Sequence, residues 1–254
     1  MSHVLSFSGG IDSTSLLLKL LSKKEPVYAL TFDYGQKHRI EIEFAKRNIS
    51  YLRDCGFTIN YQIINISDLV SILQSSLTDN NIEVPEGHYL NENMKSTFVP
   101  NRNSIFSSIV YAYCISIYKR TKTPVTLSLG VHSGDHLIYP DCRPEFYKKI
   151  MEAFQIGNWD SENIDIYLPY INIDKSDVIK DGIESCEILK IDYKTIYKNT
   201  LTTYSPDKNG FSNGKTGSDV ERILAFNNIG LEDPGLYLKP WEEILEHALE
   251  SEAD

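Results

Sequence analysis

A short run near the amino terminus, residues 8–13 with the sequence SGGIDS, holds the residue types best suited to binding phosphate. Its two adjacent glycines can adopt backbone angles that other residues avoid, and without side chains they let amide N–H groups point at an anion. Ser8 and Ser13 add hydroxyl donors, and Asp12 can cap a helix or hold Mg²⁺ beside the phosphates. These properties favour a phosphate-binding loop over a plain Gly-Gly turn.

The segments on either side of this run place it between a strand and a helix. The apolar run His3–Phe7 precedes it, and Asp12–Lys23, whose leucines recur at helical spacing, follows it. An anion is stabilised at the amino terminus of such a helix. The spacing differs from the GxxxxGK[ST] loop of Walker-type nucleotide binders and from the GxGxxG of dinucleotide binders. The sequence therefore favours nucleotide phosphates as the ligand, bound by another type of loop.

Short β-rich runs alternate with longer helical segments along most of the chain, which predicts a doubly wound α/β fold, a parallel sheet covered on both faces. The expected strands are His3–Phe7, Pro26–Phe32, Thr58–Ile64, Val125–Val131 and Ile164–Leu168, and the expected helices are Asp12–Lys23, Ile40–Cys55, Ser104–Arg120 and Trp241–Glu250. We expect residues 1–199 to form this domain and residues 200–254 to form a small, irregular or helical C-terminal extension.

Two polar stretches interrupt the pattern. Thr78–Pro100 is aperiodic, which is typical of a loop or a lid over a site. Tyr204–Ser218 combines Pro206 and three glycines with polar residues, and we expect it to be a poor core former.

Composition excludes several classes of protein. The 254 residues carry a net charge of −10, which argues against a protein that grips nucleic acid directly. No stretch approaches the roughly 18 apolar residues of a membrane span. The four cysteines include no CxxC pair, so they predict neither a disulfide framework nor a zinc site. We expect a cytoplasmic protein with reduced thiols and no membrane partner.

Further strings make the resemblance to a known family specific. They are TFDYGQ at 31–36, TFVPNRN at 97–103, LGVHSGDH at 129–136, YPDCRPEF at 139–146 and DKS at 174–176. The SGGxDS run resembles the PP-loop of ATP pyrophosphatases, and with these strings the chain resembles the 7-cyano-7-deazaguanine synthase (QueC) family over about Val4–Pro234. The resemblance implies an adenine nucleotide alpha hydrolase-like fold, a homodimer, and an ATP- and Mg²⁺-dependent ligase. Such an enzyme adenylates 7-carboxy-7-deazaguanine, makes an amide with ammonia, and uses a second ATP to reach the nitrile.

The resemblance also assigns roles to residues. ATP would contact Ser8, Gly9, Gly10, Asp12, Ser13 and Phe32, and the catalytic residues would be Asp12, Lys175 and Arg102. The two cations suit the charge that develops on the phosphates, although each could instead form a surface ion pair. The substrate would contact Tyr34, Gln36, Phe98, Arg102, Asn103, Asp135, His136, Tyr139, Asp141 and Arg143. Carboxylates accept hydrogen bonds from guanine-like N–H groups, and aromatic rings stack on the heterocycle.

The sequence departs from the family at two places. The usual GRN tripeptide reads Asn101-Arg102-Asn103, and after Gly, Asn is the residue that best tolerates left-handed backbone angles, so we expect the turn to be preserved. Where the family has four zinc-binding cysteines, this chain has Thr203, Asn213, Thr216 and Asp219. Hydroxyl, amide and one carboxylate do not make a tetrahedral zinc site of useful affinity, so we predict no structural zinc.

Several functions remain open from the sequence. The loss of the zinc ligands can be drift within a conventional nitrile synthase. It can also mark repurposing, because zinc-free relatives resembling this chain are associated with antiviral defence operons, including type IV CBASS, where the activated acid is joined to a protein amine. The sequence analysis favours this protein-conjugating reaction. A non-catalytic nucleotide sensor would be expected to lose Asp12, Ser13 or Lys175, which are all present. A tRNA-modifying pyrophosphatase would be expected to carry a basic face or CxxC pairs, and the sequence shows neither.

Overall fold

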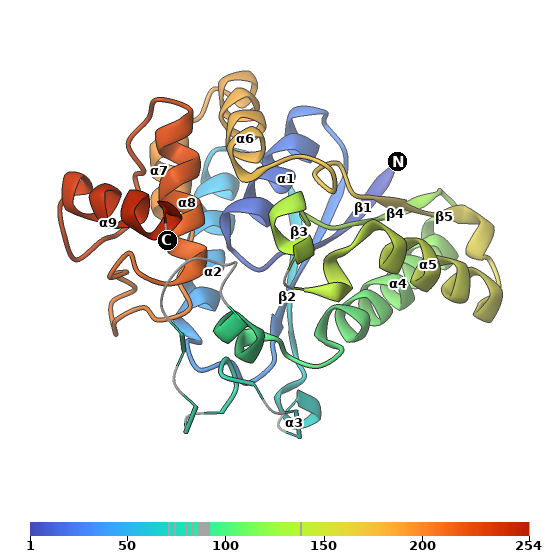
Figure 1. Ribbon diagram of the computed structural model, residues 1–254. Helices are drawn as coiled ribbons and strands as arrows, with labels where there is room; N and C mark the ends of the chain where they lie inside the picture. Colours follow the sequence, from blue (N-terminus) through green and yellow to red (C-terminus); the bar gives the residue numbers. More distant parts are fainter. Residues whose placement is uncertain are drawn as a thin grey trace.

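The computed structural model describes residues 1–70, 72–73, 75–79, 81–82, 84–85, 92–137 and 139–253. Within them, a sheet of five parallel strands has the order β3-β2-β1-β4-β5 (Figure 1). Its strands are β1 (Ser2–Ser6), β2 (Val27–Asp33), β3 (Ile59–Asn65), β4 (Val125–Ser128) and β5 (Ile164–Tyr167). Strand order reverses between β1 and β4, and ligands of open parallel sheets bind outside the carboxyl ends of strands at such a point. The predicted doubly wound α/β fold is confirmed.

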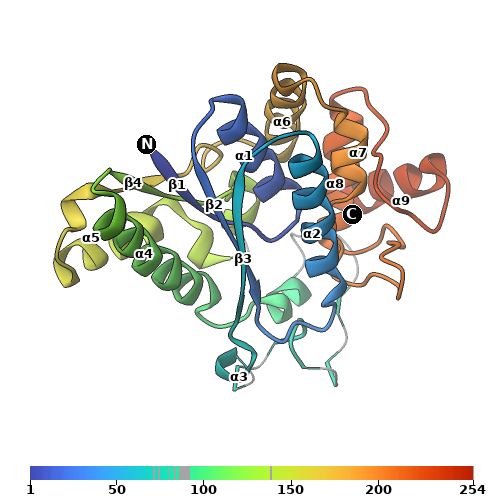
Figure 2. The same cartoon turned by 180° about the vertical axis from the view of Figure 1, so that it is seen from behind.

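Helices cover both faces of the sheet, as Figures 1 and 2 show from opposite sides. They are α1 (Ile11–Ser22), α2 (Ile40–Asp54), α3 (Ser67–Val70), α4 (Arg102–Thr121), α5 (Pro144–Gly157), α6 (Lys175–Leu189), α7 (Tyr193–Lys198), α8 (Gly217–Asn228) and α9 (Trp241–Ala253). Short 3₁₀ turns occupy Glu92–Thr97, Ser133–Leu137, Pro140–Cys142 and Ser161–Asn163. Buried leucines of α1 pack with α2, α6 and α7 in one apolar cluster, while α4 and α5 pack on the opposite face.

The predicted elements are all present with bounds shifted by a few residues, and one strand is clearly shorter than expected. Val125–Val131 was expected to be extended throughout, but β4 ends at Ser128. Beyond it the chain turns toward residues 8–13, which we call the phosphate loop after the predicted ligand, and a Cβ on Gly130 would lie 2.9 Å from the carbonyl carbon of Asp12. The missing side chain therefore lets the end of β4 approach the start of α1.

The two polar stretches are more structured than expected. The predicted loop Thr78–Pro100 contains a 3₁₀ helix, and Val99 at its end is buried in the core. Residues 80, 83 and 86–91 of that stretch lie outside the described residues, so the lid remains a prediction. Tyr204–Ser218 is irregular, but the expectation of a poor core former is wrong, because Ser212, Thr216 and Ser218 are buried in it.

Helix α8 packs in two directions at once. Its Ala225 and Phe226 join the main apolar cluster beside α1 and α6. Its Val220 and Ile223 pack instead with Ile244 of α9 in a small cluster of their own. The helix therefore ties the C-terminal residues to the helices that cover the sheet, and the domain boundary after residue 199 stays a prediction.

In the described part of the chain, no helix has both the length and the apolar character needed to cross a bilayer.

Candidate active site

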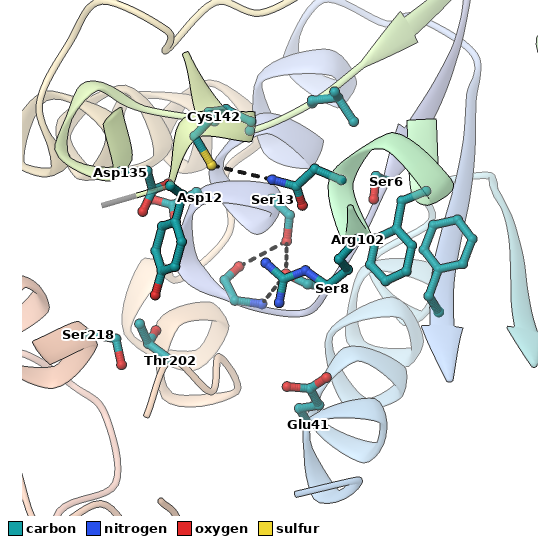
Figure 3. Close-up of a pocket in the computed structure, with 18 of the residues that line it drawn as sticks. Ser6, Ser8, Asp12, Ser13, Glu41, Arg102, Asp135, Cys142, Thr202 and Ser218 are labelled. Atoms are coloured by element: carbon teal, nitrogen blue, oxygen red, sulfur yellow. Dashed lines mark hydrogen bonds between the residues drawn. The ribbon is translucent and has the colours of Figure 1, made fainter. Parts of the chain in front are cut away.

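A cavity of about 280 Å³ lies at the carboxyl ends of β1, β2 and β4 (Figure 3). Its wall is formed by the loop between β1 and α1, the residues after β2, the start of α4, and residues 201–204 of the C-terminal segment. The predicted site residues that line it are Ser8, Gly10, Asp12, Ser13, Phe32, Tyr34, Gln36, Arg102, Asn103, Asp135, Tyr139 and Lys175. The fold thus gathers residues from distant motifs around one space.

The phosphate loop is held by its own hydroxyl groups. The Ser13 hydroxyl donates to the Gly10 carbonyl at 3.2 Å, and the Ser8 and Ser13 hydroxyls lie 3.1 Å apart. Gly10 caps α1 without a side chain, so N–H groups of the first helical turn stay available to an anion. The geometry supports the predicted phosphate-binding loop.

Gly9 has a conformational rather than a lining role. Its φ of +84° is left-handed, and a Cβ there would lie 2.8 Å from the Cβ of Ala45 on α2. No L side chain fits at that position without a shift of α2. Gly9 does not line the cavity, so the loop contacts the cavity through Ser8 and Gly10 on either side of it.

A buried ion cluster lies beside this loop. Lys175, the first residue of α6, places its Nζ 2.9 and 2.8 Å from the two carboxylate oxygens of Asp12 and 3.3 Å from Oε2 of Glu221. Burial disfavours the ammonium, but Asp12 and Glu221 outweigh burial and raise the pKa of Lys175. Burial likewise opposes ionisation of Asp12, and Lys175 outweighs it and lowers the pKa of that carboxyl. Both groups are therefore charged at neutral pH.

Arg102 brings a second cation from α4. The residue before it, Asn101, has a φ of +59°, which agrees with the expected left-handed turn at the Asn that replaces Gly. The Arg102 side chain extends from α4 into the cavity (Figure 3), with its Cζ 5.9 Å from the centre of the Tyr34 ring. The turn thus directs a guanidinium toward the space that borders the phosphate loop.

Glu41, the second residue of α2, also lines the cavity, although sequence analysis gave it no role. The Gln36 amide donates to its Oε1 at 2.6 Å, and the Gln36 side-chain oxygen accepts from the Tyr34 N–H at 2.9 Å. Burial raises the pKa of Glu41 to about 7. The sequence could have indicated Glu41, because it lies five residues after Gln36, close to the same motif.

An aromatic wall faces these polar groups. Phe32 and Phe106 stack with their ring centres 4.2 Å apart, and Tyr34 contacts Phe106 edge-on. Tyr139 lines the cavity and its hydroxyl lies 2.6 Å from that of Thr97. Sequence reasoning missed Phe106 because an aromatic residue within a helix is more often part of the core.

Four of the expected substrate residues lie outside the cavity wall. Phe98 packs beside Tyr139, and Arg143 is exposed and donates to the His136 carbonyl at 3.0 Å. Asp141 is buried and accepts from the Asn103 N–H at 3.4 Å. These side chains surround the residues that line the cavity, and direct contact of Phe98, His136, Asp141 or Arg143 with substrate remains a prediction.

Three of the four positions at which the resemblance predicts cysteine come together in the structure. The Thr203 and Thr216 hydroxyls donate to the Asp219 carboxylate at 2.8 and 2.5 Å, and the Thr216 N–H donates to it at 3.2 Å. Burial raises the pKa of Asp219, and these hydrogen bonds oppose that rise. Asn213 accepts from the Lys215 N–H at 3.0 Å. We call Thr203, Thr216 and Asp219 the hydroxyl cluster.

Metal ligands do not gather at the hydroxyl cluster or elsewhere in the described ranges, where no group of three or more His, Cys, Asp or Glu is arranged to hold an ion. The absence of zinc from the protein in solution stays a prediction.

Comparison with known proteins adds a family and close relatives. The model of the family described as queuosine biosynthesis protein QueC matches residues 2–230. A 7-cyano-7-deazaguanine synthase of Psychromonas ingrahamii is 40% identical over 235 residues, covering 92% of this chain and 96% of the relative. One of Methanoregula boonei is 40% identical over 234 residues, covering 92% and 98%. Among solved structures, the NMN synthetase of Francisella tularensis aligns with a TM-score of 0.43 and 15% identity, covering 97% of this chain and 83% of that chain.

Proposed function

The chain belongs to the QueC family of queuosine biosynthesis proteins, and from that premise we propose that it is an ATP-dependent 7-cyano-7-deazaguanine synthase acting on 7-carboxy-7-deazaguanine. The observation that carries the proposal is the cavity in which the phosphate loop meets Lys175 and Arg102, in a chain whose relatives of that name match over about nine-tenths of its length. The relatives' names favour this conventional reaction over the protein conjugation that the sequence analysis favoured. They give no support to a protein acceptor or to a dimer.

Each step of the proposed reaction forms or releases a negatively charged phosphate group, which the site must stabilise. A carboxylate oxygen of the substrate attacks the α-phosphorus of ATP, which forms an acyl adenylate and releases pyrophosphate. Ammonia then forms the C–N bond, with loss of AMP and a proton, and the amide oxygen attacks the α-phosphorus of a second ATP, which releases a second pyrophosphate. Loss of AMP and two protons from the O-adenylated amide gives the nitrile.

The residues that line the cavity suit these steps. Amides of the loop around Gly10 bind the phosphates, and the fixed charges of Lys175 and Arg102 stabilise the leaving pyrophosphate. The deazaguanine ring lies against the aromatic wall, and Asp135, another residue that lines the cavity, accepts hydrogen bonds from its N–H groups. Each role follows from a side chain that borders the same cavity.

Mg²⁺ fits one residue of this site. Asp12 is a partly exposed carboxylate beside the loop, and its lowered pKa keeps it ionised, as a carboxyl group that binds Mg²⁺ must be. The ion would neutralise charge on the phosphates and orient them. Because Asp12 also binds Lys175 through both oxygens, the Lys175 ammonium must shift for Asp12 to serve as a ligand.

Mass spectrometry of the products tests the proposal. The protein is incubated with ATP and 7-carboxy-7-deazaguanine, with and without ammonium, and pyrophosphate is measured in parallel. We expect ammonium-dependent nitrile and about two AMP for each nitrile, by the two adenylations described above. The variant Lys175→Met should lose this activity, and Lys198→Met, which changes an exposed lysine of α7, is its matched control.

Other outcomes discriminate between the alternatives. Pyrophosphate release that does not respond to the acid would contradict the proposed enzyme and favour a nucleotide sensor. An efficient reaction that stops at the amide and adds the base to an added protein would favour conjugation instead.

A further inference from the structure

Three successive polar contacts fix helix α8 against the rest of the molecule. Asp219 is held in the hydroxyl cluster, and Arg222 forms a buried pair with Asp233, with Nε at 2.6 Å and Nη2 at 2.8 Å from its two oxygens. Arg222 also donates through Nη1 to the Thr200 carbonyl at 3.2 Å. Between these two anchors on α8 lies Glu221, whose side chain reaches a different neighbour.

Glu221 contacts the ion cluster of the active site. Its Oε2 lies 3.3 Å from Nζ of Lys175, and its Oε1 lies 3.7 Å from Nδ1 of His132. Nε2 of His132 in turn lies 3.5 Å from Asp135, which lines the cavity. A carboxylate from the C-terminal segment therefore joins the cation beside the phosphate loop to an acidic residue of the cavity wall.

The loop after β4 leaves space for this carboxylate. A Cβ on Gly134 would lie 2.3 Å from Oε1 of Glu221 and 2.9 Å from Cε1 of His132. Real Cβ atoms do not approach other atoms so closely, so any larger residue at this position would displace Glu221 or the loop. The absence of a side chain at Gly134 is thus required for Glu221 to sit against Lys175.

Lys175 needs a second partner if it is to serve ATP. In the structure both oxygens of Asp12 bind its ammonium, which is almost completely buried. A lysine that turns toward phosphate oxygens must give up at least one of these contacts, and a buried charge without a partner is strongly disfavoured. Glu221 supplies a contact that does not come from the phosphate loop.

We propose that Glu221 is a positioning residue. It keeps the Lys175 ammonium beside the phosphate loop when that ammonium exchanges its contacts with Asp12 for contacts with the phosphates of ATP. The proposal rests on the proposed adenylation, and it makes α8 of the C-terminal segment part of the active site. In this proposal Lys175 contacts the substrate, and Glu221 acts only through Lys175.

Kinetics of Glu221→Gln test the proposal. We expect kcat for acid-dependent pyrophosphate release to fall about tenfold, the scale on which partners of site residues act. The KM for ATP should not rise, because the variant removes a negative charge near the phosphates. Glu246→Gln, which changes an exposed carboxylate of α9, is the matched control and should match the wild type. An unchanged kcat, or a rise in KM together with a lower melting temperature, would overturn the positioning role.

Gly134→Ala provides an independent route to the same displacement. The added methyl group pushes the flexible end of Glu221 away from Lys175, so the loss in kcat should resemble that of Glu221→Gln. In a Glu221→Ala background only the close approach to His132 remains, so Gly134→Ala should cost less kcat there than in the wild type. Equal costs in both backgrounds would contradict the proposal.

A chemical readout separates failure of this proposal from failure of the proposed function. Should the wild type release no acid-dependent pyrophosphate, the proposed function fails, and labelling of Lys175 by an acetylating reagent still tests the contact. We expect Glu221→Gln to speed the labelling of Lys175 several-fold relative to the exposed Lys180, since a less restrained side chain is more often accessible. Equal labelling in both proteins would overturn the proposal.

Discussion

The two buried polar clusters of this molecule differ in how they balance charge. Beside the phosphate loop, Lys175 is paired with two carboxylates, those of Asp12 and Glu221. In the hydroxyl cluster, one carboxylate, Asp219, is surrounded by neutral hydroxyl donors. The first cluster contains a cation that lines the cavity, while in the second each named donor is hydrogen-bonded to the protein itself.

Under the proposed function, this difference separates a site that carries out chemistry from one that stabilises the fold. Full charges held near a cavity stabilise charge that develops in a substrate. Neutral hydroxyl groups that bond to a buried carboxylate satisfy one another and fix the chain. Since α8 carries both Asp219 and Glu221, variants of the two clusters should separate activity from stability.

Replacing Lys175 should have the largest effect. Lys175→Met removes the cation beside the phosphate loop, and we expect kcat for pyrophosphate release to fall on the order of 10²–10³-fold. Steady-state assays at saturating ATP measure it, with Lys198→Met alongside. Activity within twofold of the wild type would mean that the cluster at the cavity is structural, and the comparison would fail.

Replacing Asp219 should affect stability more than activity. Asp219→Ala leaves the hydroxyls of Thr203 and Thr216 and one backbone N–H without their acceptor, at a cost of about 3 kcal/mol in the free energy of unfolding. Urea unfolding measures this cost, with Asp165→Ala, an exposed residue of β5, as the control.

Zinc content sharpens the same point. We expect elemental analysis to find far less than one zinc per chain and EDTA to leave the melting temperature unchanged, because hydroxyl and amide groups are poor zinc ligands. Stoichiometric zinc lost together with stability on chelation would show that the hydroxyl cluster is a metal site after all.

The position of the ion cluster was largely predictable from sequence, whereas for the hydroxyl cluster the resemblance indicated the positions of the residues but not the hydrogen bonds between them. The SGGIDS run lies between a strand and a helix, so its position at the end of a parallel sheet followed from the order of the elements. Asp12 and Lys175 could be assigned because each lies in a motif of the resembling family. The contact of Lys175 with Glu221 depends on how α8 packs, and no local pattern around Glu221 reports that.

The prediction that Tyr204–Ser218 is a poor core former was wrong for a physical reason. Polar residues with several glycines indicate a loop when nothing apolar is present to bury. Here the buried side chains of Ser212, Thr216 and Ser218 are polar, and hydrogen bonds take the place of an apolar pattern. The use of a buried carboxylate as the acceptor in such a core becomes visible only in three dimensions.

A pH dependence of stability should come from the cavity. Burial raises the pKa of Glu41 from an ordinary value near 4.5 to about 7, so folding favours its protonated form. The stability it contributes is complete below about pH 4.5 and is lost as the pH rises through 7, by on the order of 2 kcal/mol. When urea unfolding is measured at a series of pH values, the free energy of unfolding of Glu41→Gln should fall less across this window than that of the wild type. A parallel decline of both proteins would contradict the role of Glu41.

Ser218 lies where the hydroxyl cluster borders the cavity, and its replacement should have the smallest effect. Its side chain is buried, it lines the cavity, and its hydroxyl lies 3.0 Å from that of Thr216. If the clusters act separately, Ser218→Ala removes one neutral hydrogen bond from the hydroxyl cluster, which costs about 1 kcal/mol of stability, and changes kcat less than about twofold. A tenfold loss in kcat with unchanged unfolding would place the Ser218 hydroxyl in the reaction instead. The hydroxyl cluster would then serve to position a residue of the active site, and the division between chemistry and packing would no longer hold.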